Sequence, residues 1–172
     1  IYVNARHRDV HYRTIAEDIR KLVSSPNASV LDYGCGEATS ANLLAAACGQ
    51  LTMVEAAPNV RAALTARHAG DAKIAVLTPE QAAALPEGSF DLIVLHSVAQ
   101  YLTGAELDGL LATFRKLLKP DGLLVVGDIV PPRLAAPAAA LSLLRCGAEN
   151  GFFVAAVLGL IRIAVSDYLR LK

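Results

Sequence analysis

Two glycines placed directly after a short apolar run are the residues of this 172-residue chain best suited to binding a ligand. The run Val30–Leu31 ends in Asp32 and breaks at once into Gly34, Cys35 and Gly36. Because glycine has no Cβ, the backbone can turn sharply there and approach a bound molecule closely. A strand, a glycine turn and the start of a helix together form the place where α/β sheets bind nucleotides. At the end of the strand, Asp32 would face a ligand group that carries N–H donors or positive charge.

Polar residues also follow the next three predicted strands. Glu55 ends the second strand, about 20 residues after the first, where a carboxylate can accept hydrogen bonds from both hydroxyls of a ribose. Residues 78–81 follow the third strand, and His96–Ser97 follow the fourth. The carboxyl ends of parallel strands meet at one edge of the sheet, so we expect all these groups to lie close together.

The elements that must position these residues alternate along the chain. Apolar runs without polar alternation predict buried parallel strands at 29–33, 51–55, 73–77, 90–95 and 123–128. Amphipathic or capped stretches predict helices at 4–24, 40–48, 59–68 and 105–118, with Gly49 as the C-cap of the second helix and Thr78–Gln81 as a capping box. A turn is expected at 119–122. The alternation predicts an α/β fold, a Rossmann-like, doubly wound and mainly parallel sheet with helices on both faces.

The composition favours a small-molecule partner. At 172 residues with 54% hydrophobic residues, the chain is expected to form a single domain, residues 1–172, with a full core. The 16 basic and 16 acidic residues cancel, and aromatic residues make up only 5% with no Trp. Without a basic field or a base-stacking surface, nucleic acid is not an expected partner.

Cysteine and histidine spacing gives no metal-binding pattern. Cys35, Cys48 and Cys146 are an odd number at irregular spacing, which fits a reducing cytoplasm and no metal site. No signal peptide is visible in residues 1–24. The chain starts at Ile1 and stops within a predicted helix at Lys172, and we expect a longer protein that continues at the C-terminus.

An apolar segment follows the fifth predicted strand. Pro131–Pro132 breaks the chain, and residues 134–165 are rich in Leu, Val, Ile and Phe. The uninterrupted apolar run 151–161 is too short to span a bilayer. We expect an apolar helical segment, with 131–172 as a substrate lid; a homodimer contact or an ordinary core helix are the alternatives.

Three motifs in order resemble those of class I S-adenosylmethionine-dependent methyltransferases of the small-molecule type. They are residues 31–38 (LDYGCGEA), 87–94 (EGSFDLIV) and 117–124 (LLKPDGLL), and the loop 96–102 (HSVAQYL) is also similar to the family. Ala38 stands where the family most often has a third glycine. A nicotinamide dinucleotide site would instead need glycine where this chain has Thr39.

The resemblance implies roles for most of these polar positions. The glycine turn would line the methionine part of the cofactor, and Asp32 would bind its amino end. Glu55 would bind the ribose hydroxyls, with Ala56 beside the adenine. Either Glu80 or Gln81 would accept a hydrogen bond from the adenine amino group.

The remaining implied roles concern the reacting side of the site. His96 and Ser97 would flank the sulfonium, and His96 is the candidate general base. In related enzymes a segment like the amino-terminal helix lies over the cofactor, where Tyr12 would close the site. The expected function is methyl transfer from S-adenosylmethionine to a small, apolar acceptor. The alternatives are a regulator or scaffold that binds the cofactor without turnover and, less favoured, a nicotinamide-dependent reductase.

Overall fold

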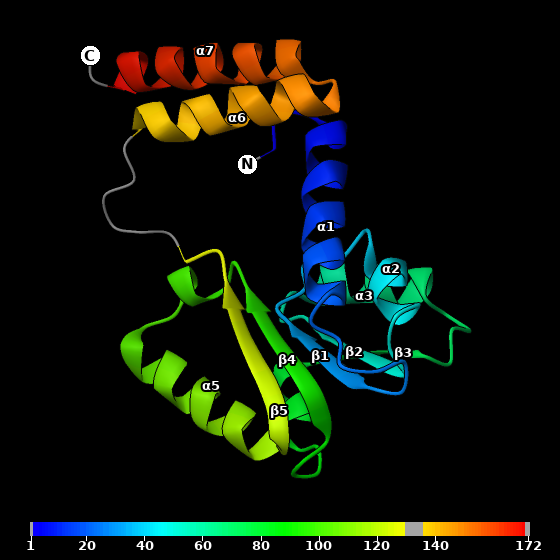
Figure 1. The fold of residues 1–172 in the computed structure, drawn as a ribbon. Helices are drawn as coiled ribbons and strands as arrows, with labels where there is room; N and C mark the ends of the chain where they lie inside the picture. The colour runs from blue at the N-terminus through cyan, green and yellow to red at the C-terminus, as the bar shows by residue number, and fades with distance from the viewer. Residues whose placement is uncertain (1, 130–135, 171–172) are drawn as a thin grey trace. The chain divides into compact units, whose positions relative to one another are not determined.

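The computed structural model describes residues 2–129 and 136–170 (Figure 1). The chain divides into two compact units, one formed by residues 15–129 and the other by residues before 15 together with residues after 129. The expected single domain over residues 1–172 stays a prediction. Pro131 and Pro132, at the start of the expected lid, lie outside the described residues.

The first unit contains a five-stranded, all-parallel sheet of order β3-β2-β1-β4-β5. The strands are β1 (Ser29–Tyr33), β2 (Gln50–Val54), β3 (Ile74–Leu77), β4 (Phe90–His96) and β5 (Leu118–Gly127). This sheet confirms the predicted α/β class. The strand order reverses between β1 and β4, which makes their carboxyl ends the topological switch point where such sheets bind ligands.

Helices cover both faces of the sheet. The last residues of α1 (Ala5–Arg20) pack on one face with α2 (Ala41–Ala45) and α3 (Pro58–Arg67), whereas α4 (Pro79–Ala83) and α5 (Gly104–Leu117) pack on the other. A single 3-10 turn, η1 (Ala99–Tyr101), follows β4. The central strands are mainly apolar because they are covered on both faces: Val30 belongs to the core cluster under α2, and Leu31 to the cluster under α5.

Two capping boxes fix where α4 and α5 begin. Thr78 Oγ1 accepts from Gln81 N at 3.2 Å, and Gln81 Oε1 accepts from Thr78 N at 2.8 Å, as the sequence predicts. Thr103 and Glu106 form the same reciprocal pair at the start of α5. Since both boxes follow strands, they fix the direction in which the chain leaves the sheet edge.

Two local expectations are wrong. The second helix ends at Ala45 rather than at residue 48, so Gly49 is not its C-cap. Gly49 instead lies against the segment that precedes β1, where a Cβ would sit 2.9 Å from the backbone of Asn27. The predicted turn 119–122 falls inside β5, which pairs Leu118 with Phe90 and then shifts register before Leu92.

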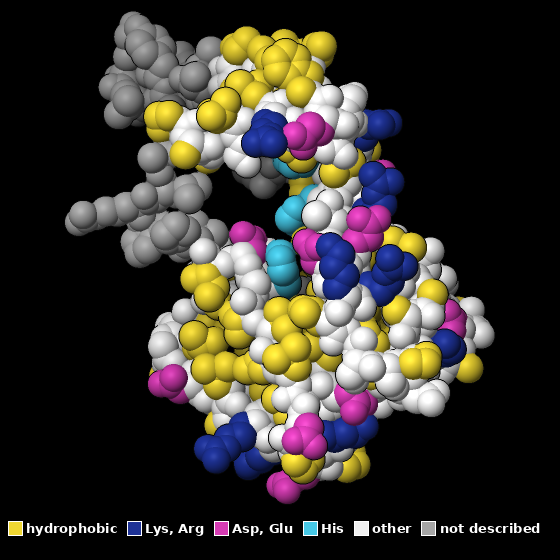
Figure 2. Space-filling model, viewed as in Figure 1, with side chains coloured by type: hydrophobic (Ala, Val, Ile, Leu, Met, Phe, Trp, Pro, Cys, Tyr) yellow, Lys and Arg dark blue, Asp and Glu magenta, His cyan; other side chains and the backbone are white. Residues whose placement is uncertain are grey.

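The second unit contains a pair of helices, α6 (Ala136–Asn150) and α7 (Phe153–Arg170), as predicted for the apolar segment. Phe152 and Ala156 are buried together with Val10 of α1. The other side of the pair is apolar and exposed, with Leu141, Phe153, Val154, Leu158 and Ile161 each about half or more accessible to solvent (Figure 2). Among the described helices, none combines the length and apolar character that a membrane crossing requires.

Candidate functional site

The glycine turn after β1 adopts the backbone conformation that favours glycine. Gly34 and Gly36 have φ of +73° and +59°. The Gly34 and Cys35 N–H groups both donate to the carbonyl oxygen of Val54, at 2.7 and 3.2 Å, which holds the turn against the end of β2. A Cβ on Gly34 would overlap Cγ2 of Val98, from the loop after β4. The turn therefore brings bare backbone to the switch point and leaves no room there for a side chain.

Glu55 ties this turn to the loop that follows β2. Its Oε2 accepts from Gly36 N at 3.0 Å, and its Oε1 accepts from Ala57 N at 2.7 Å. Arg61 of α3 donates to the carbonyl oxygens of Glu55 and Ala56, at 2.8 and 3.0 Å. Each carboxylate oxygen has two lone pairs and uses one here, so the side chain is held rigidly and can still accept two hydrogen bonds from a ligand.

Asp32 is held in the middle of the sheet, between Met53 of β2 and Val94 of β4. Burial raises the pKa of its carboxyl to about 7. A buried carboxyl with this pKa is half protonated near neutral pH and gains strongly from a cationic partner. An ammonium group is a ligand part that would supply such a charge.

The backbone of Cys35 forms part of the glycine turn, and its side chain packs in the core under α2. Burial raises the pKa of its thiol, and the charges of Asp32 and Glu55 raise it further. Because the thiolate is the reactive form, this cysteine is not a nucleophile. The predicted place of Cys35 in the site therefore rests on its main chain alone.

The loop after β3 separates the two candidates for recognition of an adenine. The amide oxygen of Gln81 already accepts from Thr78 N in the capping box. Glu80 is exposed, and its pKa is lowered by a hydrogen bond from the side chain of Thr78. Glu80 is thus the ionised acceptor of this pair. Ala56 is exposed beside Glu55, and its place beside the adenine stays a prediction.

His96 and Ser97 end β4 beside the end of β5 (Leu118–Gly127). His96 Nδ1 lies 3.0 Å from Ser97 Oγ, which in turn donates to Asp128 Oδ2 at 2.5 Å. Burial lowers the pKa of His96, and the nearby Asp128 partly offsets this. Asp128 is a site residue that sequence reasoning missed; its only signal was an acid at the carboxyl end of the fifth predicted strand.

Tyr12 is the remaining predicted site residue. It lies in the part of α1 that belongs to the second compact unit. Its contact with the cofactor stays a prediction.

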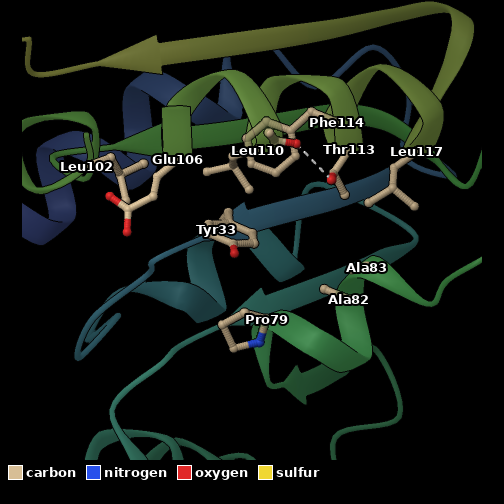
Figure 3. Close-up of a pocket in the computed structure, with 11 residues that line it drawn as sticks. Tyr33, Pro79, Ala82, Ala83, Leu102, Glu106, Leu110, Thr113, Phe114 and Leu117 are labelled. Atoms are coloured by element: carbon tan, nitrogen blue, oxygen red, sulfur yellow. Dashed lines mark hydrogen bonds between the residues drawn. The ribbon is translucent and has the colours of Figure 1, made fainter. Parts of the chain in front are cut away.

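A separate groove of about 300 Å³ opens on the α4/α5 side of the sheet (Figure 3). Tyr33 points into it from β1, Pro79 and Ala82 line it from α4, and Leu110 and Phe114 line it from α5. It is mostly apolar and includes neither the glycine turn nor Glu55. Among the described residues, no group of three or more His, Cys, Asp or Glu side chains could hold a metal ion.

Comparison with known proteins gives a family and a fold. The model of a family described as "Methyltransferase domain" matches residues 31–126. This segment runs from β1 through β5 and so contains the glycine turn, Glu55 and His96. No curated protein sequence matches the chain.

Solved structures with the same fold share little sequence with this chain. A S-adenosylmethionine-dependent methyltransferase of Leishmania major is 24% identical, with a TM-score of 0.56 over 67% of this chain and 50% of that one. A phosphoethanolamine N-methyltransferase of Haemonchus contortus, with phosphoethanolamine and S-adenosylhomocysteine, is 17% identical, with a TM-score of 0.55 over 77% and 35%. The cyclase SpnF is 21% identical, with a TM-score of 0.52 over 63% and 43%. The chain therefore spans half or less of the length of these three proteins.

Proposed function

Because this chain belongs to the methyltransferase domain family, which its residues 31–126 match, we propose that it transfers the methyl group of S-adenosylmethionine to a small, apolar acceptor. The predicted family and cofactor are confirmed by this match and by the S-adenosylmethionine-dependent enzymes that share the fold. The acceptor and the roles of individual residues are part of the proposal.

One observation carries the proposal: the carboxylate of Glu55, at the end of β2, is fixed by Gly36 N and Ala57 N. The two hydrogen bonds orient both oxygens without using all their acceptor capacity. A ribose presents two neighbouring hydroxyls, which such a carboxylate can bind together. The glycine turn supports the same ligand, since a Cβ on Gly34 would overlap Val98 and only bare backbone fits at this end of β1.

The other ends of the cofactor fit the same sheet edge. We assign the methionine ammonium to Asp32, whose buried carboxyl gains a counter-charge from it. We assign the adenine amino group to Glu80, because Gln81 is used in the capping box. Ala56 would then lie against the adenine ring.

The bound sulfonium supplies a methyl group that is already activated for displacement. The chain's own residues then have to orient the acceptor and exclude water, which can lower a barrier by roughly 7–11 kcal/mol without a protein nucleophile. Ser97 and His96, at the end of β4, would border the reacting atoms, and His96 would take a proton from an acceptor that has to lose one.

The apolar character of the acceptor is proposed from the helix pair α6–α7. Its exposed side chains, such as Val154, Leu158 and Ile161, form an apolar surface of the kind that covers a ligand or a partner. The substrate lid, the homodimer and the cytoplasmic location all stay predictions. A lid predicts that substitutions of these side chains change the acceptor's KM, whereas a dimer contact predicts a change in molecular mass in solution.

Substitution of Glu55 tests the cofactor site. We expect Glu55→Ala to weaken binding of S-adenosylhomocysteine at least tenfold in calorimetry, because two charge-assisted hydrogen bonds to the ribose are lost. Asp108→Ala, which removes an exposed acid from α5, is the matched control and should leave the affinity unchanged. Equal affinities of the two variants would refute the ribose assignment.

The cyclase that shares this fold gives a specific reason to test transfer separately from binding. Incubation with methyl-labelled S-adenosylmethionine and a metabolite extract should release S-adenosylhomocysteine and a labelled product. Binding without any labelled product would favour a regulator or scaffold. Tighter binding of a nicotinamide dinucleotide than of S-adenosylhomocysteine would favour the reductase.

A further inference from the structure

Three polar side chains at the ends of β4 and β5 form a continuous hydrogen-bonded chain. It runs from His96 Nδ1 to Ser97 Oγ over 3.0 Å, and from Ser97 Oγ to Asp128 Oδ2 over 2.5 Å. Asp128 is exposed, and His96 and Ser97 are half-buried. This series of hydrogen bonds therefore connects the solvent-exposed carboxylate of Asp128 to the more buried imidazole of His96.

The direction of these hydrogen bonds follows from the donor count. A serine hydroxyl has a single hydrogen, and Ser97 donates it to the carboxylate of Asp128. Towards His96, the same oxygen can only accept, so the hydrogen between them belongs to Nδ1. In a neutral imidazole the lone pair then lies on Nε2.

The backbone at Ser97 and Asp128 has an uncommon conformation in this hydrogen-bonded arrangement. Ser97 and Asp128 have φ of +59° and +55°, in the left-handed region that residues other than glycine adopt only uncommonly. The Ser97 N–H donates to the carbonyl oxygen of Gly127 at 3.1 Å, which links the two strand ends. Strained residues of this kind cluster at functional sites, because the surrounding structure has to maintain them.

Gly127 allows the imidazole to pack against the end of β5. A Cβ at this position would lie 2.5 Å from Cδ2 and 3.2 Å from Nε2 of His96. Because glycine has no side chain, the ring can lie directly against the backbone of the neighbouring strand, which fixes its position.

The order of the three groups separates this arrangement from a hydrolase triad. In a Ser-His-Asp triad the histidine lies between the other two and activates the serine. Here Ser97 lies in the middle and uses its hydrogen on Asp128, so the imidazole is the group that is oriented.

We infer that Ser97 and Asp128 are positioning residues that keep His96 in the Nδ1–H form with Nε2 as the base, and that the acceptor is therefore a hydroxyl or an acidic C–H compound. The inference rests on the methyl transfer proposed above. The acceptor atom forms a bond to the methyl carbon, the carbon–sulfur bond breaks with its electron pair on sulfur, and the acceptor's proton moves to Nε2.

Two electrostatic effects agree with this role. Burial lowers the pKa of His96, which keeps the imidazole neutral and able to accept a proton at neutral pH. The carboxylate of Asp128, linked through Ser97, favours the imidazolium that forms after the transfer.

Nitrogen NMR of the intact protein tests the tautomer without an acceptor. The His96 signals, assigned by their loss in His96→Gln, should show Nδ1–H as the main neutral form. In Ser97→Gly, which removes the hydroxyl but accommodates the positive φ, the Nε2–H form should become the main one. Asp128→Asn should lower the pKa of His96 while the tautomer is kept. A wild-type imidazole mainly in the Nε2–H form, or an unchanged ratio in Ser97→Gly, would overturn the inference.

Two more measurements separate this inference from the proposed function. If S-adenosylhomocysteine binds and labelled product forms while the tautomer result is negative, only the positioning role fails. If labelled products from the extract carry methyl on oxygen or carbon, the acceptor class is supported; methyl only on amine nitrogen would overturn it. Absence of any labelled product would count against methyl transfer itself, while the tautomer result would still decide the role of Ser97.

Discussion

The two ends of the candidate site are built in different ways. On the side of β1 and β2, backbone N–H groups form the hydrogen bonds: Gly36 N and Ala57 N hold Glu55, and Gly34 N donates to the carbonyl oxygen of Val54. On the side of β4 and β5, side chains form the hydrogen bonds, from His96 through Ser97 to Asp128. The first side is a rigid binding surface formed mainly by backbone groups. The second side consists of side chains whose protonation can change.

This difference teaches which region should tolerate substitution. A binding surface made of backbone fails when a side chain intrudes, and Asp32 is the group beside β1 whose protonation changes near neutral pH. The hydrogen-bonded side chains beside β4 stay in place when one hydrogen bond is lost, but the protonation of His96 changes. We therefore expect steric changes to act most strongly beside β1, and changes of a proton or a hydroxyl to act beside β4.

The largest effect is expected from Gly34→Val. Its side chain would overlap Val98, would displace the loop after β4, and would force a β-branched residue into a positive φ. We expect the affinity for S-adenosylhomocysteine, measured by calorimetry, to fall at least about 100-fold, or about 2.7 kcal/mol.

Gly88→Val is the matched control for backbone strain. Gly88 also has a positive φ, of +67°, but a Cβ there meets nothing within 4 Å. Both variants should lose stability in thermal unfolding, and only Gly34→Val should lose affinity beyond that. A similar loss of affinity in both would mean that backbone strain, and not the overlap with Val98, is responsible.

The side built from backbone is also the side that could be predicted from the sequence. Its signals are local: an apolar run, the glycines 34 and 36, and an acid one strand later at the spacing that a parallel sheet requires. The choice between Glu80 and Gln81 could not be made, because it depends on which side chain completes the cap of α4.

The part of the site at the ends of β4 and β5 was predicted only in part. His96 and Ser97 are adjacent in sequence, but Asp128 joins them through the pairing of β4 with β5, 31 residues away. Positive φ at Ser97 and Asp128 has no signal in residue type, since neither is glycine. The prediction that Gly49 is a helix C-cap was wrong for a related reason. Gly49 allows a close approach to Asn27, a contact between distant residues that no local pattern indicates.

Asp32→Asn should give the next largest effect and remove the pH dependence that Asp32 gives to the β1 side. The methionine ammonium would lose its counter-charge, and we expect the affinity to fall about 10- to 100-fold at pH 7.5. In the wild-type protein, the affinity should rise as the pH increases towards about 7, because Asp32 must release its proton to pair with the ammonium. This rising limb, measured by calorimetry from pH 5.5 to 8, should vanish in Asp32→Asn.

The same substitution should stabilise the protein without ligand. The pKa of Asp32 is about 7 in the folded chain and near 3.8 when unfolded, so ionisation costs stability as the pH rises between these values. The upper bound is about 1.4 kcal/mol for each pH unit in this window. Asp32→Asn should therefore gain stability over the wild type above pH 7 and little at pH 4. A constant difference at all pH values would contradict the buried carboxyl.

The smallest effect is expected from Ala38→Gly, at the position where the family most often has glycine. Ala38 has a φ of +39°, which glycine would adopt without strain, a gain of about 1 kcal/mol. Its buried methyl group packs in the core under α2, however, and removing it costs about 0.8 kcal/mol. Glycine also costs roughly 0.5–1 kcal/mol in backbone entropy. These terms nearly cancel, so the free energy of unfolding in urea should change by less than about 1 kcal/mol. A gain above about 2 kcal/mol would mean that the positive φ of Ala38 costs more than the packing of its methyl group and the entropy of glycine together.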